Sequence, residues 1–595
     1  MSTAIVTGQP VPGSPLEGDL RSLGFDVRVA SDAADVATLL AAVPGDQRIA
    51  VVDARFVGHL HALRLALTDP RFAASAVPGA VTAKPEARKA LTHALPSNTG
   101  DTDPLPDAIA TAMESGATDV HRPELGTLVA TVPTDPQTRN EARQAVAAVD
   151  DEAVRLRTAV KSRDGFFTTY CISPYSRYIA RWCARRGLTP NQVTTASLLT
   201  ALIAAGCAAT GTRGGFVAAG LLLILSFVLD CTDGQLARYS LQYSTLGAWL
   251  DATFDRAKEY AYYAGLALGA ARGGDDVWAL ALGAMVLQTC RHVVDFSFNE
   301  ANHDATANTS PTAALSDKLD SVGWTVWVRR MIVLPIGERW ALIAVLTAVT
   351  TPRITLVVLL IGCALAACYT TAGRVLRSLT RKATRTDRAA TALADLADNG
   401  PLASAFSALR PRVTWLRPAP VLAFVGGAGL IGTALSNSYG GPAVVAAAAL
   451  YIALSGLALV MPLKAPLDWL VPPFFRAAEY GTILVLAAKA DVNGALPAAF
   501  GLVAAVAYHH YDTVYRIKGG TGAPPAWLVR AIGGQEGRAL VVAVAAALLP
   551  ATDFTVALTA LAVAVALVVL VESIHFWVTA HKRGAPAVHD EGEPA

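Results

Sequence analysis

The chain has 595 residues, with 49 basic and 47 acidic side chains, and its formal net charge at pH 7 is only +2. Hydrophobic residues make up 53% of it and charged residues 16%, and the mean hydropathy is +0.41. Soluble proteins are about a quarter charged, so this composition excludes a disordered, coiled-coil or ordinary cytosolic chain. The balanced charge gives no reason to expect nucleic acid as a partner. We therefore expect a polytopic α-helical membrane protein in a lipid bilayer.

The N-terminal 165 residues differ from the rest, because they have ordinary charge density and no apolar run long enough to cross a bilayer. Their opening has no basic segment followed by an apolar one, so we expect no signal peptide. Short β-type runs alternate with helical runs, which predicts a small cytoplasmic α/β domain. The β-type runs are 3–7, 26–30 and 48–53, and the helical runs are 16–23, 33–42 and 60–67. A polar stretch at 97–140 indicates a linker, and a polar helix is expected at 140–160.

From residue 190 onward, apolar segments long enough to cross a bilayer follow one another. They are 193–212, 215–233, 246–270, 275–297, 335–350, 354–376, 418–436, 441–462, 474–489, 495–510, 537–550 and 553–580. The connection 374–417 holds nine Lys and Arg residues, whereas 271–276 and 350–353 hold one Arg each. Because cytoplasmic connections are the basic ones, we expect a multi-pass protein of the plasma membrane with both termini in the cytoplasm.

Four carboxylates lie in one stretch, DCTDGQLARYSLQYSTLGAWLDATFD, which runs from 230 to 255. Asp230 and Asp233 share one helical face, as do Asp251 and Asp255, and the two pairs end one span and begin the next. Carboxylates at the edge of a membrane span need a compensating partner. Four converging acids with almost no local base imply divalent cations, and oxygen ligands favour Mg²⁺ or Mn²⁺.

Small and basic residues accompany the four acids. Gly234 and Ala237 lie on the face of Asp230 and remove side-chain bulk where a ligand can approach, and Arg238 offers a planar guanidinium suited to phosphate. Together with two metal ions, these residues predict a site for phosphoryl transfer.

The spacing D-x2-D-G-x2-A-R-x8-G-x3-D-x3-D, in which Gly247 is the later glycine, resembles without departure the signature of the CDP-alcohol phosphotransferase (CDP-alcohol phosphatidyltransferase) family. The upstream segment SPYSRYIARWCARRGLTPNQVT at 173–194 also resembles this family, with an interfacial amphipathic helix that leads into the first span. The resemblance covers about 160–380 and implies a six-helix membrane enzyme that displaces CMP from a CDP-alcohol by the hydroxyl of a second alcohol. It implies a role in phospholipid or inositol-phosphate lipid biosynthesis, with CDP-diacylglycerol or a similar donor.

The resemblance also implies roles for single residues. Asp230, Asp233 and Asp251 bind metal, while Asp255 completes the second of two metal sites and acts as the general base. The residues implied to bind the CDP moiety are Gly234, Ala237, Arg238, Ser244, Gly247, Asn191 and Thr194.

The acceptor alcohol is suggested by the segment KSRDGFFTTYCISPYSR at 161–177, which resembles the linker of inositol-phosphate-transferring members. This favours an inositol-phosphate-like acceptor, with glycerol phosphate as the next alternative. A phosphorylated acceptor needs basic side chains, and the candidates are Arg291, Arg329, Arg330 and Arg339, although positive-inside anchoring explains them equally. His292 is expected to be a packing or helix-end residue.

The N-terminal domain occupies the place where fused relatives keep a nucleotidyltransferase. It has no G-x-G-x-x-G and no P-loop, and Gly8 and Gly13 bracket prolines without a following Lys or Arg. Asp53, at the end of a strand run, is either a ligand or a helix cap. We expect a non-catalytic domain, with an active nucleotidyltransferase and an unidentified binding domain as alternatives.

The C-terminal third repeats features of the first membrane domain. RAKEYAYYAGLALGAA (256–271) is echoed by RAAEYGTILVLAAKA (476–490), RHVVD (291–295) by HHYD (509–512), and GERWALIAVLTAV (337–349) by GQEGRALVVAVAAAL (534–548). Asp468 stands alone where the first copy has four aspartates, so a second copy is expected to be inactive. Six unrelated spans are the alternative. Because members of the family generally pair as dimers, we expect an intramolecular pseudo-dimer or a homodimer.

These features divide the chain into a 1–125 α/β domain, a 126–165 linker with a polar helix, a 166–380 transferase domain, a 381–416 basic cytoplasmic linker, a 417–582 second membrane domain and a 583–595 cytoplasmic tail. The alternative function is a catalytically weak membrane scaffold or a transporter-like protein, which an internal repeat also suits.

Overall fold

The computed structural model describes residues 2–95, 104–161, 164–309, 327, 331–380, 382–408 and 418–582. The chain forms two compact units. The first comprises Met1–Ser162, Pro174–Pro190 and Thr232–Ser244, and the second comprises Arg163–Ser173, Asn191–Cys231 and Thr245–Ala595. The boundary passes through one continuous helix, α10 (Arg213–Ser240), whose last turns belong to the first unit.

A six-stranded sheet with the order β2-β1-β3-β6-β5-β7 forms the centre of the first unit. Its strands are β1 (Ser2–Thr7), β2 (Phe25–Ala30), β3 (Arg48–Asp53), β5 (Ala74–Val77), β6 (Ala80–Ala83) and β7 (Val120–His121). β1 pairs in parallel with β2 and β3, whereas β6 is antiparallel to both β3 and β5. Strand β3 is apolar on both faces, as expected of a strand covered by helices on each side.

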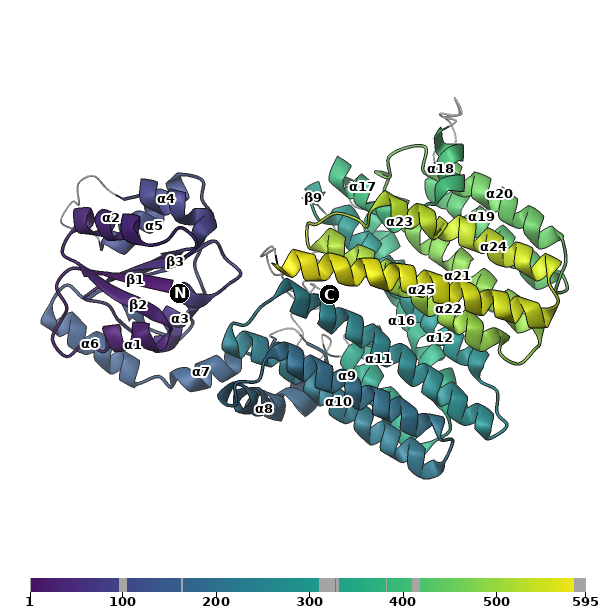
Figure 1. The fold of residues 1–595 in the computed structure, drawn as a ribbon, viewed down its shortest axis with the longest axis horizontal. Coiled ribbons are helices and arrows are strands. Elements are labelled where there is room, and N and C mark those ends of the chain that lie inside the picture. The colour runs from purple at the N-terminus through teal and green to yellow at the C-terminus, as the bar shows by residue number, and fades with distance from the viewer. Residues whose placement is uncertain are drawn as a thin grey trace. The chain divides into compact units, whose positions relative to one another are not determined.

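Helices cover both faces of this sheet (Figure 1). One core layer contains residues of α1 (Leu16–Ser22) and α3 (Leu60–Thr68), and the other contains residues of α2 (Ala33–Ala42), α4 (Arg88–His93) and α5 (Leu105–Ser115). The first three strands and the three helices predicted from the sequence are therefore confirmed.

The stretch at 97–140 is not a linker throughout, since its described part joins the α/β fold. Helix α5 packs into the core through Ile109 and Met113, β7 pairs with β5, and β8 (Ala130–Thr131) pairs with β4 (Val57–Gly58). Two helices, α6 (Pro136–Ala147) and α7 (Asp151–Thr158), stand where the sequence suggested one, because an aspartate caps the start of each.

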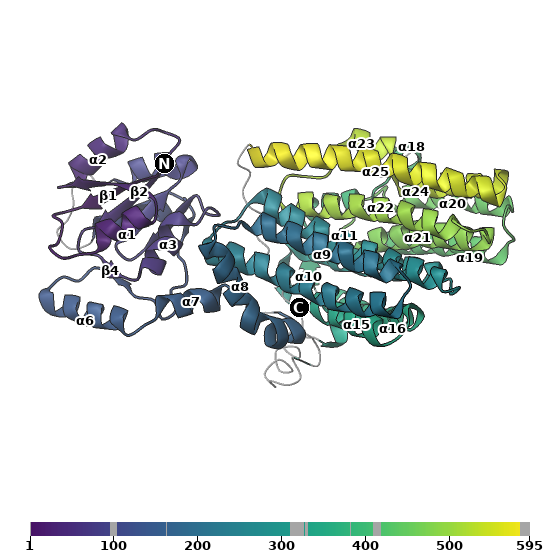
Figure 2. The ribbon, with the colours of Figure 1, turned by 60° about the horizontal axis from the view of Figure 1, so that its bottom comes forward.

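Long helices make up the second unit, and Figures 1 and 2 show them running side by side. All the predicted apolar segments are helical. With α10, the helices are α9 (Pro190–Ala209), α11 (Thr245–Arg272), α12 (Trp278–Asn302), α15 (Ile336–Val349), α16 (Pro352–Thr380), α19 (Ala419–Ser436), α20 (Ala443–Ala458), α21 (Val471–Ala490), α22 (Ala495–Lys518), α24 (Gly534–Leu548) and α25 (Ala551–Lys582). Before them comes α8 (Ser173–Arg185), which exposes Tyr175, Tyr178 and Trp182 among arginines, as a membrane-surface helix does.

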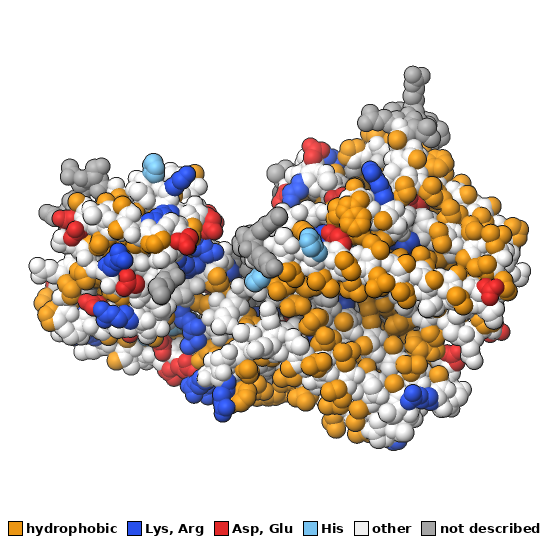
Figure 3. Space-filling model, viewed as in Figure 1, with side chains coloured by type: hydrophobic (Ala, Val, Ile, Leu, Met, Phe, Trp, Pro, Cys, Tyr) orange, Lys and Arg blue, Asp and Glu red, His pale blue; other side chains and the backbone are white. Residues whose placement is uncertain are grey.

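Seven helical segments of the described chain are long and apolar enough to cross a membrane. They are Pro190–Ala209, Arg213–Ser240, Pro352–Thr380, Ala419–Ser436, Asp468–Ala490, Ala526–Leu548 and Ala551–His581. Apolar side chains cover much of the visible face of the helical unit (Figure 3), and exposed leucines and valines such as Leu365 and Val571 lie on the outside of its helices. An apolar surface of this extent is suited to contact with lipid.

Helices from the two halves of the second unit pack directly against one another. Helix α12 contacts α16, α21 and α22, and α25 runs along α22 and α11. Trp249 of α11 stacks on Trp577 of α25, with ring centroids 6.0 Å apart. The predicted basic linker contains two further helices, α17 (Asp387–Leu396) and α18 (Pro401–Ala408), and Leu396 of α17 is buried against Tyr511 of α22.

Candidate metal centre

A tight turn joins the two helices that carry the acidic residues. Leu241 ends α10 in the left-handed conformation at φ 52°, and the amide of Gln242 donates to the carbonyl of Ala237 over 3.0 Å. This is the Schellman arrangement, which closes a helix and reverses the chain. The C-terminal turns of α10, with Asp230 and Asp233, are thereby joined to the first turns of α11, with Asp251 and Asp255.

Three of the four carboxylates meet at one point. Asp230, Asp233 and Asp251 each offer one oxygen, and these oxygens lie within 4.8 Å of one another. Asp233 is buried and the other two are half-buried. Like charges held this close in a poorly hydrated place need a cation, and three hard oxygens fit a divalent ion such as Mg²⁺.

Asp255 has a different neighbour, Lys258, which the predicted site does not include. The ammonium group of Lys258 lies 2.8 Å from its Oδ1 and also contacts Oδ1 of Asp230. Lys258 is fully buried, and its ammonium donates to the hydroxyl of Ser197 over 3.2 Å. The i,i+3 spacing from Asp255 to Lys258 on one helix was the available signal.

The residues expected to bind CDP lie on the same stretch of chain or at the start of α9. Gly234, Ala237 and Arg238 are half-buried on the last turns of α10, and Arg238 Nε donates to the carbonyl of Ala159 over 2.6 Å. A side chain at Gly234 would meet nothing nearer than that guanidinium, at 3.5 Å. Ser244 lies in the turn before α11 and Gly247 in its first turn, and both are half-buried; the other two, Asn191 and Thr194, lie in the first turns of α9.

The expected acceptor-binding arginines are already in contact with protein groups. Arg339 is buried, with its Nε 3.1 Å from Glu259 Oε1, and the buried Arg291 donates to the carbonyl of Val333. The other two, Arg329 and Arg330, lie outside the described residues. His292 is hydrogen-bonded to Gln288 at 2.6 Å and to the hydroxyl of Tyr511, a packing environment like the one expected.

Arg339 belongs to a buried ion triad that has a counterpart in the other half of the helical unit. Arg256 Nη1 lies 3.0 Å from Glu259 Oε2, so Glu259 is held by an arginine on each side. Glu479 is held in the same way, since Arg476 Nη1 is 3.0 Å and Arg538 Nε 2.5 Å from its oxygens.

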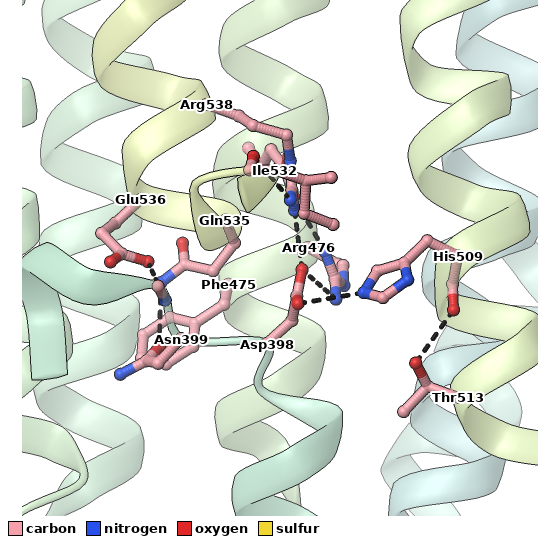
Figure 4. Close-up of polar contacts among 12 residues, drawn as sticks. Asp398, Asn399, Phe475, Arg476, His509, Thr513, Ile532, Gln535, Glu536 and Arg538 are labelled. Carbon is pink, nitrogen blue, oxygen red and sulfur yellow. Dashed lines mark hydrogen bonds and ion pairs between the residues drawn. The ribbon is translucent and has the colours of Figure 1, made fainter. Parts of the chain in front are cut away.

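Asp398 extends the second triad, and Figure 4 shows its contacts with Arg476, Arg538 and His509. Asp398 Oδ2 lies 2.7 Å from Arg538 and 3.0 Å from Arg476, and its Oδ1 lies 3.2 Å from His509. The carboxylate of Asp468, the residue expected in place of the four aspartates, accepts instead from the amide of Ala465 over 2.7 Å. No group of three acidic, histidine or cysteine ligands occurs in the described part of this half.

The first unit has a cavity of about 450 Å³ beside the end of α10, lined mainly by α3, α7 and residues Ser240 and Leu241. Arg64 donates to the carbonyl of Ser240 over 3.1 Å, and Arg155 donates to that of Tyr239 over 2.9 Å. His61 is buried among them, and burial together with the charges of Arg155 and Arg64 lowers its pKa to about 4.

The carboxylate of Asp53 binds the loop that directly follows it. Its Oδ1 accepts from the amide of Arg55 over 2.8 Å, and its Oδ2 pairs with that guanidinium at 2.9 Å. Because both oxygens of Asp53 already bind its own loop, the residue is closer to a capping aspartate than to a ligand of a bound group.

Comparison with known proteins matches each half of the helical region to a different family. Residues 187–366 match the CDP-alcohol phosphatidyltransferase family, which confirms the resemblance seen in the sequence, and 387–595 match a family of unknown function, DUF5941.

Several curated proteins are similar to part of the chain. A phosphatidylinositol phosphate synthase of Streptomyces avermitilis is 34% identical over 130 residues, which are 21% of this chain and 51% of that protein. An archaetidylinositol phosphate synthase of Pyrococcus horikoshii is 31% identical over 113 residues, 19% of this chain and 58% of that protein. A bifunctional IPC transferase and DIPP synthase of Aquifex aeolicus is 32% identical over 114 residues, 19% of this chain and 26% of that protein. The chain thus spans about half the length of the first two relatives and about a quarter of the third.

Proposed function

We propose that this chain, whose residues 187–366 match the CDP-alcohol phosphatidyltransferase family, is a membrane enzyme that transfers a phospho-alcohol group from a CDP-alcohol to a second alcohol and releases CMP. The observation that carries the proposal is the meeting of Asp230, Asp233 and Asp251 at the junction of α10 and α11. The names of the similar proteins favour a phosphorylated inositol as acceptor and CDP-diacylglycerol or a related lipid as donor.

The chemistry follows from the charges at the site. A divalent ion held by the three carboxylates would neutralise the diphosphate of the donor. Arg238, half-buried on the same helix, carries a guanidinium of the kind that binds phosphate. Asp255 accepts the proton of the acceptor hydroxyl while that oxygen forms its bond to phosphorus and the bond from phosphorus to CMP breaks.

The test is to incubate the purified full-length protein with CDP-diacylglycerol and a panel of alcohols and phosphorylated alcohols, and to measure CMP. We expect release with a phosphorylated polyol, its loss in excess chelator, and its recovery with Mg²⁺ or Mn²⁺. Asp230→Ala should eliminate turnover, whereas Asp468→Ala, a buried aspartate of the other half, should leave it nearly unchanged. A folded, metal-binding protein that releases no CMP with any acceptor would favour the scaffold or transporter-like alternative.

We further infer that the second half of the helical unit is a degenerate, inactive copy of the first. The two ion triads, Arg256–Glu259–Arg339 and Arg476–Glu479–Arg538, support this, because both use the same atoms at similar distances. The two halves also correspond in a backbone contact. Glu338 accepts a hydrogen bond from the amide of Phe167 in the first half, and Glu536 accepts hydrogen bonds from the amides of Gly400 and Ala403 in the second. In each half, a glutamate on the fifth helix thus binds the backbone of the segment that precedes the first.

The same proposal includes twelve spans, a plasma-membrane location and cytoplasmic termini. The basic connection before α19 supports this orientation. Cysteine labelling checks it: a cysteine at the exposed Asp387 should react from the cytoplasmic side, and one at the exposed Gly274 should react from the opposite side.

A further inference from the structure

The ammonium group of Lys258 lies in the acidic site and is held there by oxygen atoms. A lysine ammonium has three N–H donors and no acceptor. Three oxygens surround that of Lys258, namely Oδ1 of Asp230, Oδ1 of Asp255 at 2.8 Å and Oγ of Ser197 at 3.2 Å. Asp230 Oδ1 and Ser197 Oγ accept hydrogen bonds from the ammonium, and Asp255 Oδ1 forms an ion pair with it.

The surroundings of Lys258 also keep it in place. Its side chain has no exposed surface, and the ring of Trp340 lies 5.4 Å from its ammonium group. Ser197 is fixed in turn, because its hydroxyl donates to the carbonyl of Ser226 over 2.8 Å. A buried ammonium is tolerated only while its partners remain, so leaving this position would strand a charge in a poorly hydrated interior.

The acids divide into two sets around this lysine. Asp230, Asp233 and Asp251 form the group that can hold a metal ion, and Asp255 is not a member of it. A second divalent ion between Asp230 and Asp255 would lie beside the ammonium that already contacts one oxygen of each carboxylate. Its charge of +2 would then be added next to the +1 of the ammonium, and Glu259, the next carboxylate along α11, already pairs with Arg256 and Arg339.

We propose that Lys258 takes the place of one of the two cations, so that the centre binds a single divalent ion on Asp230, Asp233 and Asp251. The ammonium then balances Asp255 and holds its carboxylate toward the acceptor. Lys258 is a positioning residue in this arrangement, since it acts through Asp255. The inference rests on the proposed function, and it replaces the two metal ions that the family resemblance implies with one.

The experiment counts ions in the purified full-length protein without substrate, using Mn²⁺. Titration followed by electron paramagnetic resonance gives both the stoichiometry and the coupling, because two ions about 4 Å apart would be exchange-coupled. We expect one uncoupled ion per chain in the wild type and in Lys258→Arg, which keeps the charge. Lys258→Met removes the charge at similar volume, so a second, coupled ion should appear. Lys489→Met removes an ammonium that binds the carbonyls of Leu435 and Asn437, and this variant should still bind one ion.

Two coupled ions in the wild type would overturn the inference, and if CMP is still released, the proposed function would stand. A well-folded Lys258→Met protein that binds one ion would equally contradict it, because the second place would then be closed for another reason. If Lys258→Met does not fold, the number of Mn²⁺ ions bound per wild-type chain still tests the inference. Absence of both Mn²⁺ binding and CMP release would contradict the proposed function together with the inference.

Discussion

At the scale of single residues, Asp255 shares the ammonium group of Lys258 with Asp230, but it differs from the other three aspartates because it is not part of the group that can hold a metal ion. Its carboxylate can therefore serve as a base without being needed to hold the ion. We expect Asp255→Asn to lower kcat by a factor of about 10² to 10⁴, the usual contribution of a general base. Binding of the CDP-alcohol, measured by calorimetry, should change much less, since Asp230, Asp233 and Asp251 remain. An equal loss of binding and turnover would mean that Asp255 acts mainly as a metal ligand.

His61 gives the α/β domain a predictable response to pH. Burial and two nearby arginines lower its pKa from 6.5 to about 4, so it stays neutral in the folded protein while the unfolded chain takes up a proton. Stability is therefore complete above about pH 6.5 and falls as the pH is lowered toward 4, by up to about 3 kcal/mol. Hydrogen exchange of the α/β domain in the whole protein, corrected for the intrinsic rate, should show this loss. This loss of stability at low pH should persist when the exposed His93 is replaced by Gln, and it should disappear in His61→Gln.

At the scale of elements, the C-terminus of α10 is contacted by α3 and α7, which lie in the same compact unit. Arg64 and Arg155 donate to the carbonyls of Ser240 and Tyr239, which a helix end leaves without intrahelical partners, and a positive charge is favourable there. We therefore expect the α/β domain to support the end of α10 that carries Asp230 and Asp233.

We expect the double variant Arg64→Ala, Arg155→Ala to loosen this helix end and lower kcat/KM about tenfold or more, since each such bond contributes about 1 kcal/mol. Hydrogen exchange at the end of α10 should rise with it. The matched control is Arg48→Ala, whose guanidinium binds the carbonyls of Leu67 and Asp69 at the end of α3 and makes no bond to α10. Unchanged kinetics in the double variant would show that the α/β domain does not influence the site.

At the scale of the whole molecule, the second half of the helical unit covers surface that the first half would otherwise expose. Helix α12 packs on α21 and α22, and α25 lies along α11, where Trp249 stacks on Trp577. Deleting 418–595 should therefore produce a protein that self-associates or melts at a lower temperature in detergent, measured by light scattering and thermal denaturation. Packing in lipid rests on shape more than on hydrophobic drive, so the loss can be partial. A monomeric, fully active truncated protein would contradict the pseudo-dimer proposal.

The features that depend on neighbouring residues could be predicted from the sequence. The apolar runs predicted the helices, alternation predicted the first three strands, and the spacing of the four aspartates predicted two acidic faces at the junction of α10 and α11. These signals are local, because helix and strand periods place residues i, i+2, i+3 and i+4 without reference to the rest of the chain. The hairpin of β5 and β6 was not predicted, since short alanine-rich strands carry little of the composition that marks a strand.

Which helix faces meet could not be predicted from local patterns and is seen only in the folded chain. Folding brought Lys258 against Asp230, 28 positions earlier, and Arg339 against Glu259, 80 positions away. It also placed Arg64 of the α/β domain on the carbonyl of Ser240. Buried charges select such partners because the cost of leaving one unpaired exceeds any local preference, and the partner is whatever the packing of the helices supplies. The order of residues along the chain therefore revealed the acids, whereas the cation that faces them became visible only in the folded protein.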